Sequence, residues 1–371
     1  MTSDEIVEQA FTVIGEALSL EPDDFQDHES WKFLGLGDLL ASATASDLSS
    51  AIEVKVTPED FVRYPTVGAF KQFLSAGGDT TITDHAASNG TSKSVPEPEP
   101  SDPWEGIPKP RVPLSVPLQG KPTAPGPNVF LFPDGSGAGM SYGTLPPVND
   151  NVCLIALNSP FLLQAQNFTC SIERMAKLWV GEVRKQQPEG PYILGGWSAG
   201  GYYAFEVAKL LTAAGQKVEQ LILIDSPCRL EFEALPEQVV QQLTKNGLMG
   251  ASGQKKAPEW LVQHFTSTVI SVDRYMPTPS AKDHVPPKVS FIWVKEGLVQ
   301  DVAKSGLEVD LNVKVTRFLL EPRPDLKTVG WEKLLPGAQY TFDYMTGNHF
   351  EITQSPHVST VPNHDYIVVP C

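Results

Sequence analysis

The segment from Pro191 to Leu211, "PYILGGWSAGGYYAFEVAKLL", constrains the fold more than any other part of the sequence. An apolar run leads into Gly196-Trp197-Ser198-Ala199-Gly200, and a helical pattern of apolar residues follows. Glycines on both sides let a strand and a helix approach closely enough to hold the serine in a sharp turn with its hydroxyl exposed. This order predicts that Ser198 is a nucleophile at the edge of a mostly parallel sheet flanked by helices.

A serine hydroxyl reacts only when a base takes its proton and an acid orients that base. In the α/β-hydrolase fold, which the strand, serine and helix order predicts, the acid and then the histidine follow the nucleophile along the chain. His349 is the candidate base, because it follows the strand-like run "AQYTFDYM" in a short turn near the chain end. Two positions stay open for the acid: Asp225, which ends the run "LILID", and Glu296 or Asp301, which follow "VSFIWV".

The negative charge that develops on the attacked carbonyl oxygen needs donors that are already in place, and backbone N–H groups supply them in this geometry. We expect one donor at Ala199, immediately after the nucleophile. The other is expected in the Gly-rich turn after the apolar run 129–132, from Asp134 or Gly135. The sequence does not separate these two.

Composition divides the chain. Residues 1–78 have the apolar spacing of three or four short helices, which predicts a small all-α bundle, and they carry 14 Asp plus Glu against 4 Lys plus Arg. Residues 79–126 are rich in Pro, Ser and Gly and are predicted to form a flexible linker. Residues 127–371 are predicted to form the α/β-hydrolase domain, with a helical lid at about 229–278.

Several motifs between Pro133 and Phe350 resemble the thioesterase domains of fungal nonreducing polyketide synthases: "LFPDGSG", "GGWSAGG", "LILIDSPC", "KAPEWL" and "GNHF". In that family the acid is the Asp of the Ile-Asp-Ser-Pro turn. The resemblance therefore favours Asp225 as the acid and leaves Glu296 as a weaker second. It also implies that Ser198 attacks a carrier-bound acyl thioester.

Residues 4–76 resemble the acyl carrier domains of the same synthases, through "LGLGDLL" and "YPTVGAFKQFL". In that family an Asp-Ser-Leu turn carries phosphopantetheine on the serine. Here Gly37 stands at the position of the Asp and Asp38 at that of the Ser, and a frame shifted by one residue places Leu39 there. Asp caps a helix about as well as Ser, so this change removes the attachment chemistry and spares the fold. We expect a degenerate carrier without a cofactor of its own.

Because no arm can be loaded at Asp38, the substrate is expected to arrive on the phosphopantetheine arm of another protein's carrier. The sequence then predicts a stand-alone, trans-acting thioesterase that hydrolyses an aromatic polyketide from a separate nonreducing synthase, giving an acid such as a resorcylic acid. Two alternatives stay open: a Claisen-type cyclase that releases a ring-closed product, and a docking or editing protein of the synthase.

Charge and composition argue against other partners. A net charge of −16 without clustered Lys and Arg predicts no nucleic-acid binding. No apolar run is long enough to span a membrane, and the acidic start "MTSDEIVEQA" predicts no leader, so we expect a cytoplasmic protein. Four scattered cysteines without ligand spacing predict no metal site.

Overall fold

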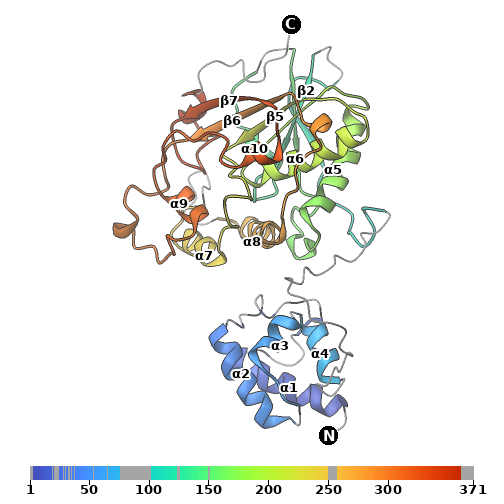
Figure 1. The fold of residues 1–371 in the computed structure, drawn as a ribbon, viewed down its shortest axis with the longest axis vertical. Helices are drawn as coiled ribbons and strands as arrows, with labels where there is room; N and C mark the ends of the chain where they lie inside the picture. Colours follow the sequence, from blue (N-terminus) through green and yellow to red (C-terminus); the bar gives the residue numbers. More distant parts are fainter. Residues whose placement is uncertain are drawn as a thin grey trace. The chain divides into compact units, whose positions relative to one another are not determined.

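The computed structural model describes residues 3–75, with gaps at 19, 21–24, 28, 30, 32, 33, 35, 37, 53 and 65, and residues 102–360, with gaps at 123–125, 149–150 and 250–256. Contacts within the chain divide it into two compact units, Met1–Ser94 and Val95–Cys371. We call these the N-terminal unit and the C-terminal unit. Figure 1 draws the fold of each.

The N-terminal unit is helical in its described residues. Its helices are α1 (Ser3–Leu18), α2 (Asp38–Ala51), α3 (Pro58–Arg63) and α4 (Val67–Ser75). A capping box formed by Thr57 and Asp60 starts α3 just before its N-terminal proline. Aromatic rings fill the core: Trp31 contacts Phe61 and Phe70 edge to face, at centroid distances of 5.4 and 5.2 Å. The small all-α bundle expected from the sequence is present.

The C-terminal unit is built on a seven-stranded sheet in the order β1-β3-β2-β4-β5-β6-β7. All neighbours are parallel except β1 and β3, which run antiparallel. The strands are β1 (Ser115–Gln119), β2 (Asn128–Phe132), β3 (Cys153–Leu157), β4 (Tyr192–Trp197), β5 (Val218–Ile224), β6 (Lys288–Val294) and β7 (Gln339–Met345). Parallel strands put their carboxyl ends at one edge of the sheet, and residues that follow β2, β4, β5 and β7 meet there.

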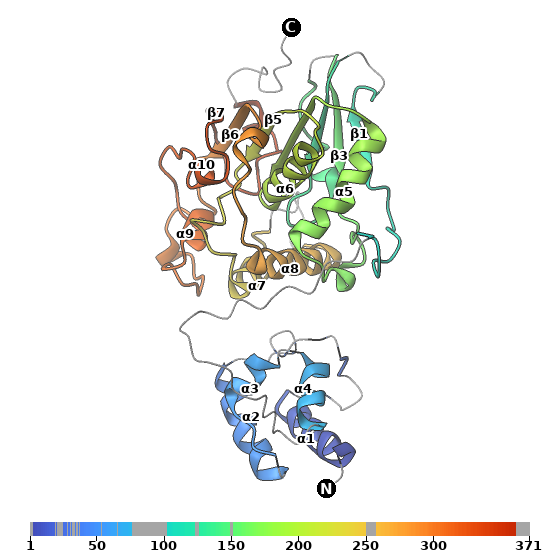
Figure 2. The same cartoon turned by 45° about the vertical axis from the view of Figure 1, so that its right-hand side comes forward.

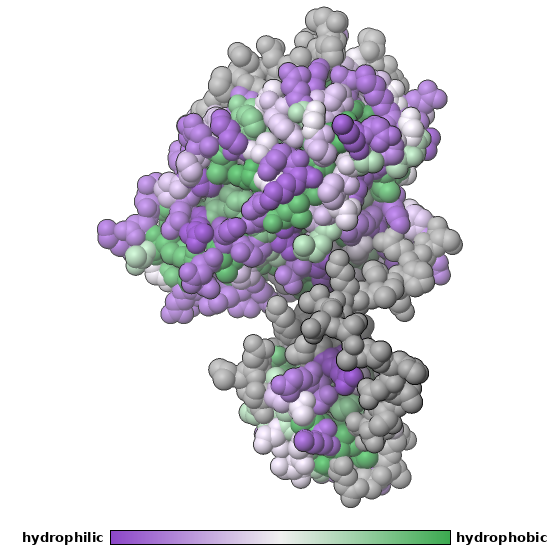
Figure 3. All heavy atoms as spheres, in the orientation of Figure 1, coloured by the Kyte–Doolittle hydropathy of each residue, from purple (hydrophilic) through white to green (hydrophobic). Residues whose placement is uncertain are grey.

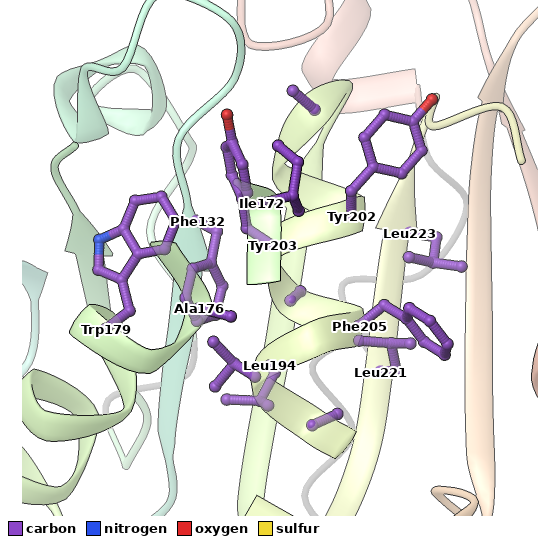
Figure 4. Close-up of a cluster of buried hydrophobic side chains, with 14 of the residues drawn as sticks. Phe132, Ile172, Ala176, Trp179, Leu194, Tyr202, Tyr203, Phe205, Leu221 and Leu223 are labelled. Carbon is purple, nitrogen blue, oxygen red and sulfur yellow. The ribbon is translucent and has the colours of Figure 1, made fainter. Parts of the chain in front are cut away.

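Alternating residues of the strands pack into two separate cores, one on each face of the sheet. In β2, Phe130 and Phe132 pack on one face of the sheet, and Val129 and Leu131 pack on the other. The first face is covered by α5 (Ile172–Gln186) and α6 (Ala199–Ala213). Figure 4 shows side chains from α5 and α6 packed against those of β2, β4 and β5 in this core.

The opposite core includes side chains from α7 (Glu237–Lys245) and α9 (Lys314–Leu320). Two other helices complete the unit, α8 (Glu259–Arg274) and the single turn α10 (Trp331–Leu334). In both ribbon views α7 and α8 lie next to each other at one end of the sheet (Figures 1 and 2). Five short 3-10 segments complete the described structure: Gly139–Tyr142, Ala165–Asn167, Lys282–His284, Val302–Lys304 and His357–Thr360.

Part of the predicted linker belongs to the C-terminal unit. Within the 79–126 segment, β1 pairs with β3, and Trp104 and Ile107 pack against the main core. The linker prediction is therefore wrong over residues 102–122. Its proline content was misleading, because an edge strand tolerates a proline such as Pro117, which donates no hydrogen bond to the ladder. Residues 79–101 lie outside the described part of the chain.

The face of the C-terminal unit drawn in Figure 3 is mainly hydrophilic, with apolar residues set between polar ones. Four large apolar side chains are exposed in the described residues: Met140, Leu163, Ile270 and Met276. Scattered exposed apolar residues of this kind are ordinary for a folded domain.

Candidate active site

Ser198 occupies the sharp turn between β4 and α6. Its backbone is held at φ 57° and ψ −123°, a region that a non-glycine residue enters only under constraint from its surroundings. The Ser198 N–H donates to the carbonyl of Ile224 at 2.9 Å. A Cβ added at Gly196 would lie 2.2 Å from the carbonyl carbon of Gly200, so the two glycines of the motif permit the close crossing of strand and helix. The turn expected from the sequence is formed.

His349 lies in the turn after β7, buried in the described structure. Its Nε2 atom is 3.1 Å from the Oγ of Ser198. The imidazole packs between the rings of Trp197, Phe318 and Phe350, with centroid distances of 5.6, 6.4 and 5.2 Å. This packing fixes the orientation of the ring toward the serine hydroxyl.

Asp225 follows β5 and completes the series of contacts. Its Oδ2 accepts a hydrogen bond from the Nδ1 of His349 at 2.7 Å, and its side chain is fully buried. The backbone is again at positive φ, 43°. Glu296, the other candidate acid, accepts a hydrogen bond from the N–H of Gly347 at 3.2 Å. Asp301 caps the short segment after it through the N–H of Ala303. Of the three candidate acids, Asp225 is the one that contacts His349.

Arg323 is part of this arrangement and was not found from the sequence. Its Nη1 and Nη2 atoms donate to Oδ1 and Oδ2 of Asp225 at 2.9 and 3.0 Å, and its guanidinium lies 3.9 Å from the centroid of the Phe318 ring. Arg323 stands between two prolines in a loop after α9, where nothing in the local pattern indicates a buried cation. Arg323 and Asp225 are 98 residues apart in the sequence, and only the fold brings them into contact.

Charge around Asp225 holds it ionised. Complete burial alone would raise the pKa of its carboxyl, but the charge of Arg323 and the hydrogen bond from His349 outweigh that effect and hold the pKa below its ordinary value. The N–H of Val294 also donates to Oδ1, at 3.2 Å. An ionised Asp225 favours the His349 tautomer with its proton on Nδ1, which leaves Nε2 free to accept a proton from Ser198.

The three candidates for the two oxyanion donors occupy two different surroundings. Ala199 and Gly135 border the same cavity as Ser198 and His349. Among the described residues, no hydrogen bond uses the backbone N–H of Gly135 or of Ala199. Asp134 borders a neighbouring cavity instead. Its carboxylate accepts hydrogen bonds from the hydroxyls of Ser136 and Ser141, and burial raises its pKa.

The cavity beside Ser198 spans about 610 Å³ of empty space, a volume that includes space open to solvent. Its wall is mostly apolar and comes from α8, α9 and the turn after β7. Of the residues in the predicted lid segment 229–278, the cavity is bordered by Glu233, Ala234, Leu235, Phe265, Thr268, Val269 and Val272. The contribution of α9, through Val315, Phe318 and Leu319, was not anticipated from the sequence.

The sequence-predicted carrier site is only partly described. Helix α2 begins at Asp38, the residue at the family's serine position, while Gly37 and the side chain of Asp38 lie outside the described part of the structure. In the described ranges, no group of three or more His, Cys, Asp or Glu side chains is arranged to hold a metal ion. No helix among the described residues has both the length and the apolar character needed to cross a membrane.

Comparison with known families shows to which family the chain belongs. A family model described as "Thioesterase domain" matches residues 127–364, well over half of the chain. The chain belongs to the thioesterase domain family. A second model, described as "Phosphopantetheine attachment site", matches residues 9–74, ahead of the thioesterase domain. The N-terminal helices are therefore those of a carrier-type domain.

The relatives of this thioesterase chain are fungal synthases. It is 32% identical to the non-reducing polyketide synthase terA of Aspergillus terreus over 98% of its own length, and 36% identical to the non-reducing polyketide synthase 1 of Elsinoe fawcettii over 69%. It spans only 18% and 12% of those two proteins. A solved four-domain nonribosomal peptide synthetase bound to AMP and glycine shares the fold over 95% of this chain and 25% of its own, with 20% identity and a TM-score of 0.50.

Proposed function

We propose that this chain is a serine thioesterase that releases an acyl group from a carrier domain by hydrolysis. The observation that carries the proposal is the series of contacts from Ser198 through His349 to Asp225, at 3.1 and 2.7 Å, beside an apolar cavity. Membership of the thioesterase family supports the reaction class. Ser198 is the proposed nucleophile, His349 the base and Asp225 the residue that orients it.

In the first half of the reaction the Oγ of Ser198 attacks the thioester carbonyl carbon while its proton moves to Nε2 of His349. The oxygen of the tetrahedral intermediate accepts hydrogen bonds from the N–H groups of Ala199 and Gly135, two residues that border the same cavity. The C–S bond then breaks, and the imidazolium returns its proton to the departing sulfur. The products are a free pantetheinyl thiol and an acyl ester on Ser198.

In the second half, water attacks the acyl ester and gives its proton to His349. The bond between the acyl carbon and the Oγ of Ser198 breaks, the serine takes the proton back, and a carboxylic acid leaves. Arg323 contributes by keeping Asp225 ionised, so that the imidazolium formed in each half faces a carboxylate. Each half therefore ends with Ser198 and His349 ready for the next step.

The substrate class follows from the relatives and from the cavity. The relatives are fungal non-reducing polyketide synthases, and an apolar cavity lined by Phe265, Phe318 and Phe350 suits an aryl or alkyl chain. We infer that the acyl group is an aromatic polyketide and the product an aromatic acid such as a resorcylic acid.

The carrier-type domain leads us to infer that the chain acts in trans, with residues 1–78 as the degenerate carrier and 127–371 as the thioesterase. Positions 37 to 39 are Gly37, Asp38 and Leu39, none of which has a hydroxyl that could take the phosphodiester of a phosphopantetheine arm. The residues present do not fit that group, so no step is assigned to an arm on this chain. The acyl group would then come from the loaded carrier of a separate non-reducing synthase.

The test combines a non-reducing synthase that lacks a thioesterase with this chain or with Ser198→Ala, in water labelled with 18O. We expect a new carboxylic acid that carries the label and that is not released with Ser198→Ala. An unlabelled, ring-closed product that depends on Ser198 would show Claisen cyclisation in place of hydrolysis. Binding of the synthase with no release that depends on Ser198 would favour a docking role.

A further inference from the structure

Helix α8 is tied to the turn that carries the proposed oxyanion donor Gly135. Two of its side chains converge on one atom: the Nδ1 of His264 lies 2.9 Å from the carbonyl oxygen of Gly135, and the Oγ1 of Thr268 donates to the same oxygen at 3.0 Å. His264 and Thr268 are four residues apart and therefore share a face of the helix. Both are buried, with exposed fractions of 1% and 2%.

The turn is also fitted closely to α8. A Cβ added at Gly135 would lie 2.7 Å from ring atoms of Phe265, and one at Gly137 would lie 2.4 Å from the ring of His264. Gly137 is at φ +76°, a conformation that favours glycine. The glycines of "PDGSG" therefore let the turn lie directly on α8, where neighbouring side chains of the helix contact it.

The direction of the His264 hydrogen bond follows from chemistry. A carbonyl oxygen only accepts, so Nδ1 carries the proton, and the two lone pairs of the oxygen accommodate both donors. Burial lowers the pKa of His264 to about 4, so the ring stays neutral near pH 7. The Nε2 atom is buried and has no hydrogen-bond partner among the described residues. The bond to Gly135 is the polar contact that orients this ring, with Thr268 beside it at 3.3 Å.

We propose that His264 and Thr268 are positioning residues for the oxyanion hole, which anchor Gly135 to α8 through its carbonyl so that the N–H of Gly135 stays directed at the reacting carbonyl. The proposal rests on the serine thioesterase function proposed above. The carbonyl belongs to the peptide group after Gly135 and the N–H to the peptide group before it. The two hydrogen bonds to the carbonyl and the close packing of Gly135 on Phe265 together restrain the φ and ψ angles of Gly135 that set the direction of its N–H. Thr268 and Gly135 both border the cavity of Ser198, so the restraint acts at the reacting centre.

Helix α8 would then have two roles: it positions Gly135, and it forms part of the cavity wall. Phe265, Val269 and Val272 of this helix form part of the wall that would contact the acyl chain. One rigid element would then hold the substrate and the donor that stabilises its transition state. Because a misplaced oxyanion donor weakens transition-state binding more than substrate binding, loss of either hydrogen bond should lower kcat and leave KM nearly unchanged.

Two matched pairs of variants test the proposal on the full chain. Thr268→Val keeps the shape and removes the donor, and Thr268→Ser restores a hydroxyl. His264→Leu removes the ring donor, and His264→Asn places an amide N–H near the position of Nδ1. With an aryl pantetheine thioester we expect Thr268→Val and His264→Leu to lower kcat roughly 10- to 100-fold, with Thr268→Ser and His264→Asn recovering most of the loss.

A second readout separates positioning from general structural damage. An aryl boronic acid binds Ser198 as a tetrahedral anion that resembles the intermediate, whereas an aryl amide of the same shape occupies the cavity as a neutral ligand. In Thr268→Val the boronic acid should bind more weakly by about the factor lost in kcat, and the amide should bind as it does to the wild type.

The outcomes are distinct. No Ser198-dependent turnover by the wild-type chain would defeat the proposed function itself. An active wild type with Thr268→Val unchanged in kcat, or with both inhibitors weakened equally, would overturn the positioning role. If His264→Leu does not fold, the Thr268 pair decides alone, because valine and threonine have nearly the same shape.

Discussion

Three groups donate hydrogen bonds to the buried carboxylate of Asp225: the guanidinium of Arg323, the imidazole of His349 and the N–H of Val294. At the scale of single residues, these partners hold the carboxylate in one orientation. A buried charge is tolerated only with such partners, since leaving one unpaired costs several kcal/mol. In the proposed mechanism, the reactivity of Ser198 therefore depends on the Arg323 guanidinium, which does not border the cavity.

Replacement of Arg323 by leucine should expose that dependence. Without the guanidinium, the pKa of the Asp225 carboxyl rises, so kcat/KM should fall off at a higher pH on the acid side of the profile than it does in the wild type. The unfolding free energy should fall by about 3 kcal/mol, because one partner of a buried pair is lost. Kinetics from pH 4 to 9 and urea unfolding measure the two effects.

The matched control is Arg317→Leu. This arginine lies on the exposed side of α9 and bonds only a nearby backbone carbonyl in the described structure, that of Leu311. Its variant should keep the wild-type pH profile. Equal profiles for Arg323→Leu and Arg317→Leu would contradict the role assigned to Arg323.

His264 should make stability depend on pH. The pKa of His264 in the folded chain, about 4, lies below its ordinary value of 6.5. Between these two pH values, His264 is therefore protonated in the unfolded chain and neutral in the folded chain. The contribution of His264 to the unfolding free energy is therefore fully present above pH 6.5 and is lost as pH falls toward 4. Between pH 7.5 and pH 5 this residue should cost about 2 kcal/mol.

The measurement is urea unfolding of the wild type and of His264→Asn at both pH values. The asparagine variant lacks this titration, so its stability should fall less on acidification, by about that amount. Parallel losses in the two proteins would contradict the burial and neutrality assigned to His264. Other titrating groups contribute equally to both proteins and cancel in the difference.

Much of the site was predictable at the residue scale because each signal was local. The motif around Ser198 and the turn of His349 are short patterns next to apolar strands, and the family resemblance favoured Asp225 over Glu296. Arg323, His264 and Thr268 had no such signal. Each acts on a residue about 100 or more positions away, and only the folded chain brings the partners together.

At the scale of elements, the crossing of β2, β4 and α6 sets the geometry of the turn at Ser198. A Cβ at Gly200 would lie 2.5 Å from the carbonyl oxygen of Phe132 and 3.0 Å from that of Pro133. Both atoms are backbone and cannot rotate away. The hydroxyl of Tyr142 adds a brace, since it donates to the carbonyl of Phe132 at 2.6 Å and accepts from the N–H of Trp197 at 2.8 Å.

Gly200→Ala should therefore separate α6 from the end of β2. We expect a loss of about 2 to 3 kcal/mol in unfolding free energy, typical of overpacking, together with a fall in kcat. Gly181→Ala in α5 is the control, because a Cβ there meets nothing within 4 Å and alanine is the better helix residue. Its expected effect is a gain of up to about 1 kcal/mol, read from thermal melts; equal effects would contradict the crowding argument.

The elements themselves were unevenly predictable. Helices in the N-terminal unit and the strand before Ser198 carry clear apolar periodicity. Strand β1 was missed because a five-residue segment that contains a proline shows little of the alternation typical of a strand. Its pairing with β3, which the local sequence does not reveal, is what makes it a strand. Helix α9 was missed for a similar reason: it has only seven residues, and its stability depends on packing against the core. Within the predicted lid, Val239, Val240 and Leu243 do not border the cavity of Ser198 and belong instead to the buried core.

At the scale of the whole molecule, the two domains raise the question of how the acyl group reaches Ser198. The wild-type chain, treated with coenzyme A and a phosphopantetheinyl transferase, should gain no mass, because Asp38 has no hydroxyl that could accept the phosphopantetheine group. Asp38→Ser should gain one phosphopantetheine, read from intact-protein mass, if the remaining carrier fold is competent. Loading of the wild type, for example at Ser42, would contradict the degenerate carrier and allow the acyl group to be carried in cis.

The central claim is that the acyl group passes through Ser198, and rapid quenching tests it most directly. The chain is mixed with an aryl pantetheine thioester, quenched within one turnover and digested, and the acylated peptide is identified by mass. The account predicts the acyl group on Ser198, none in Ser198→Ala, and slower formation in His349→Ala. Undiminished turnover by Ser198→Ala, or an acyl group on another residue such as Cys228, would contradict it.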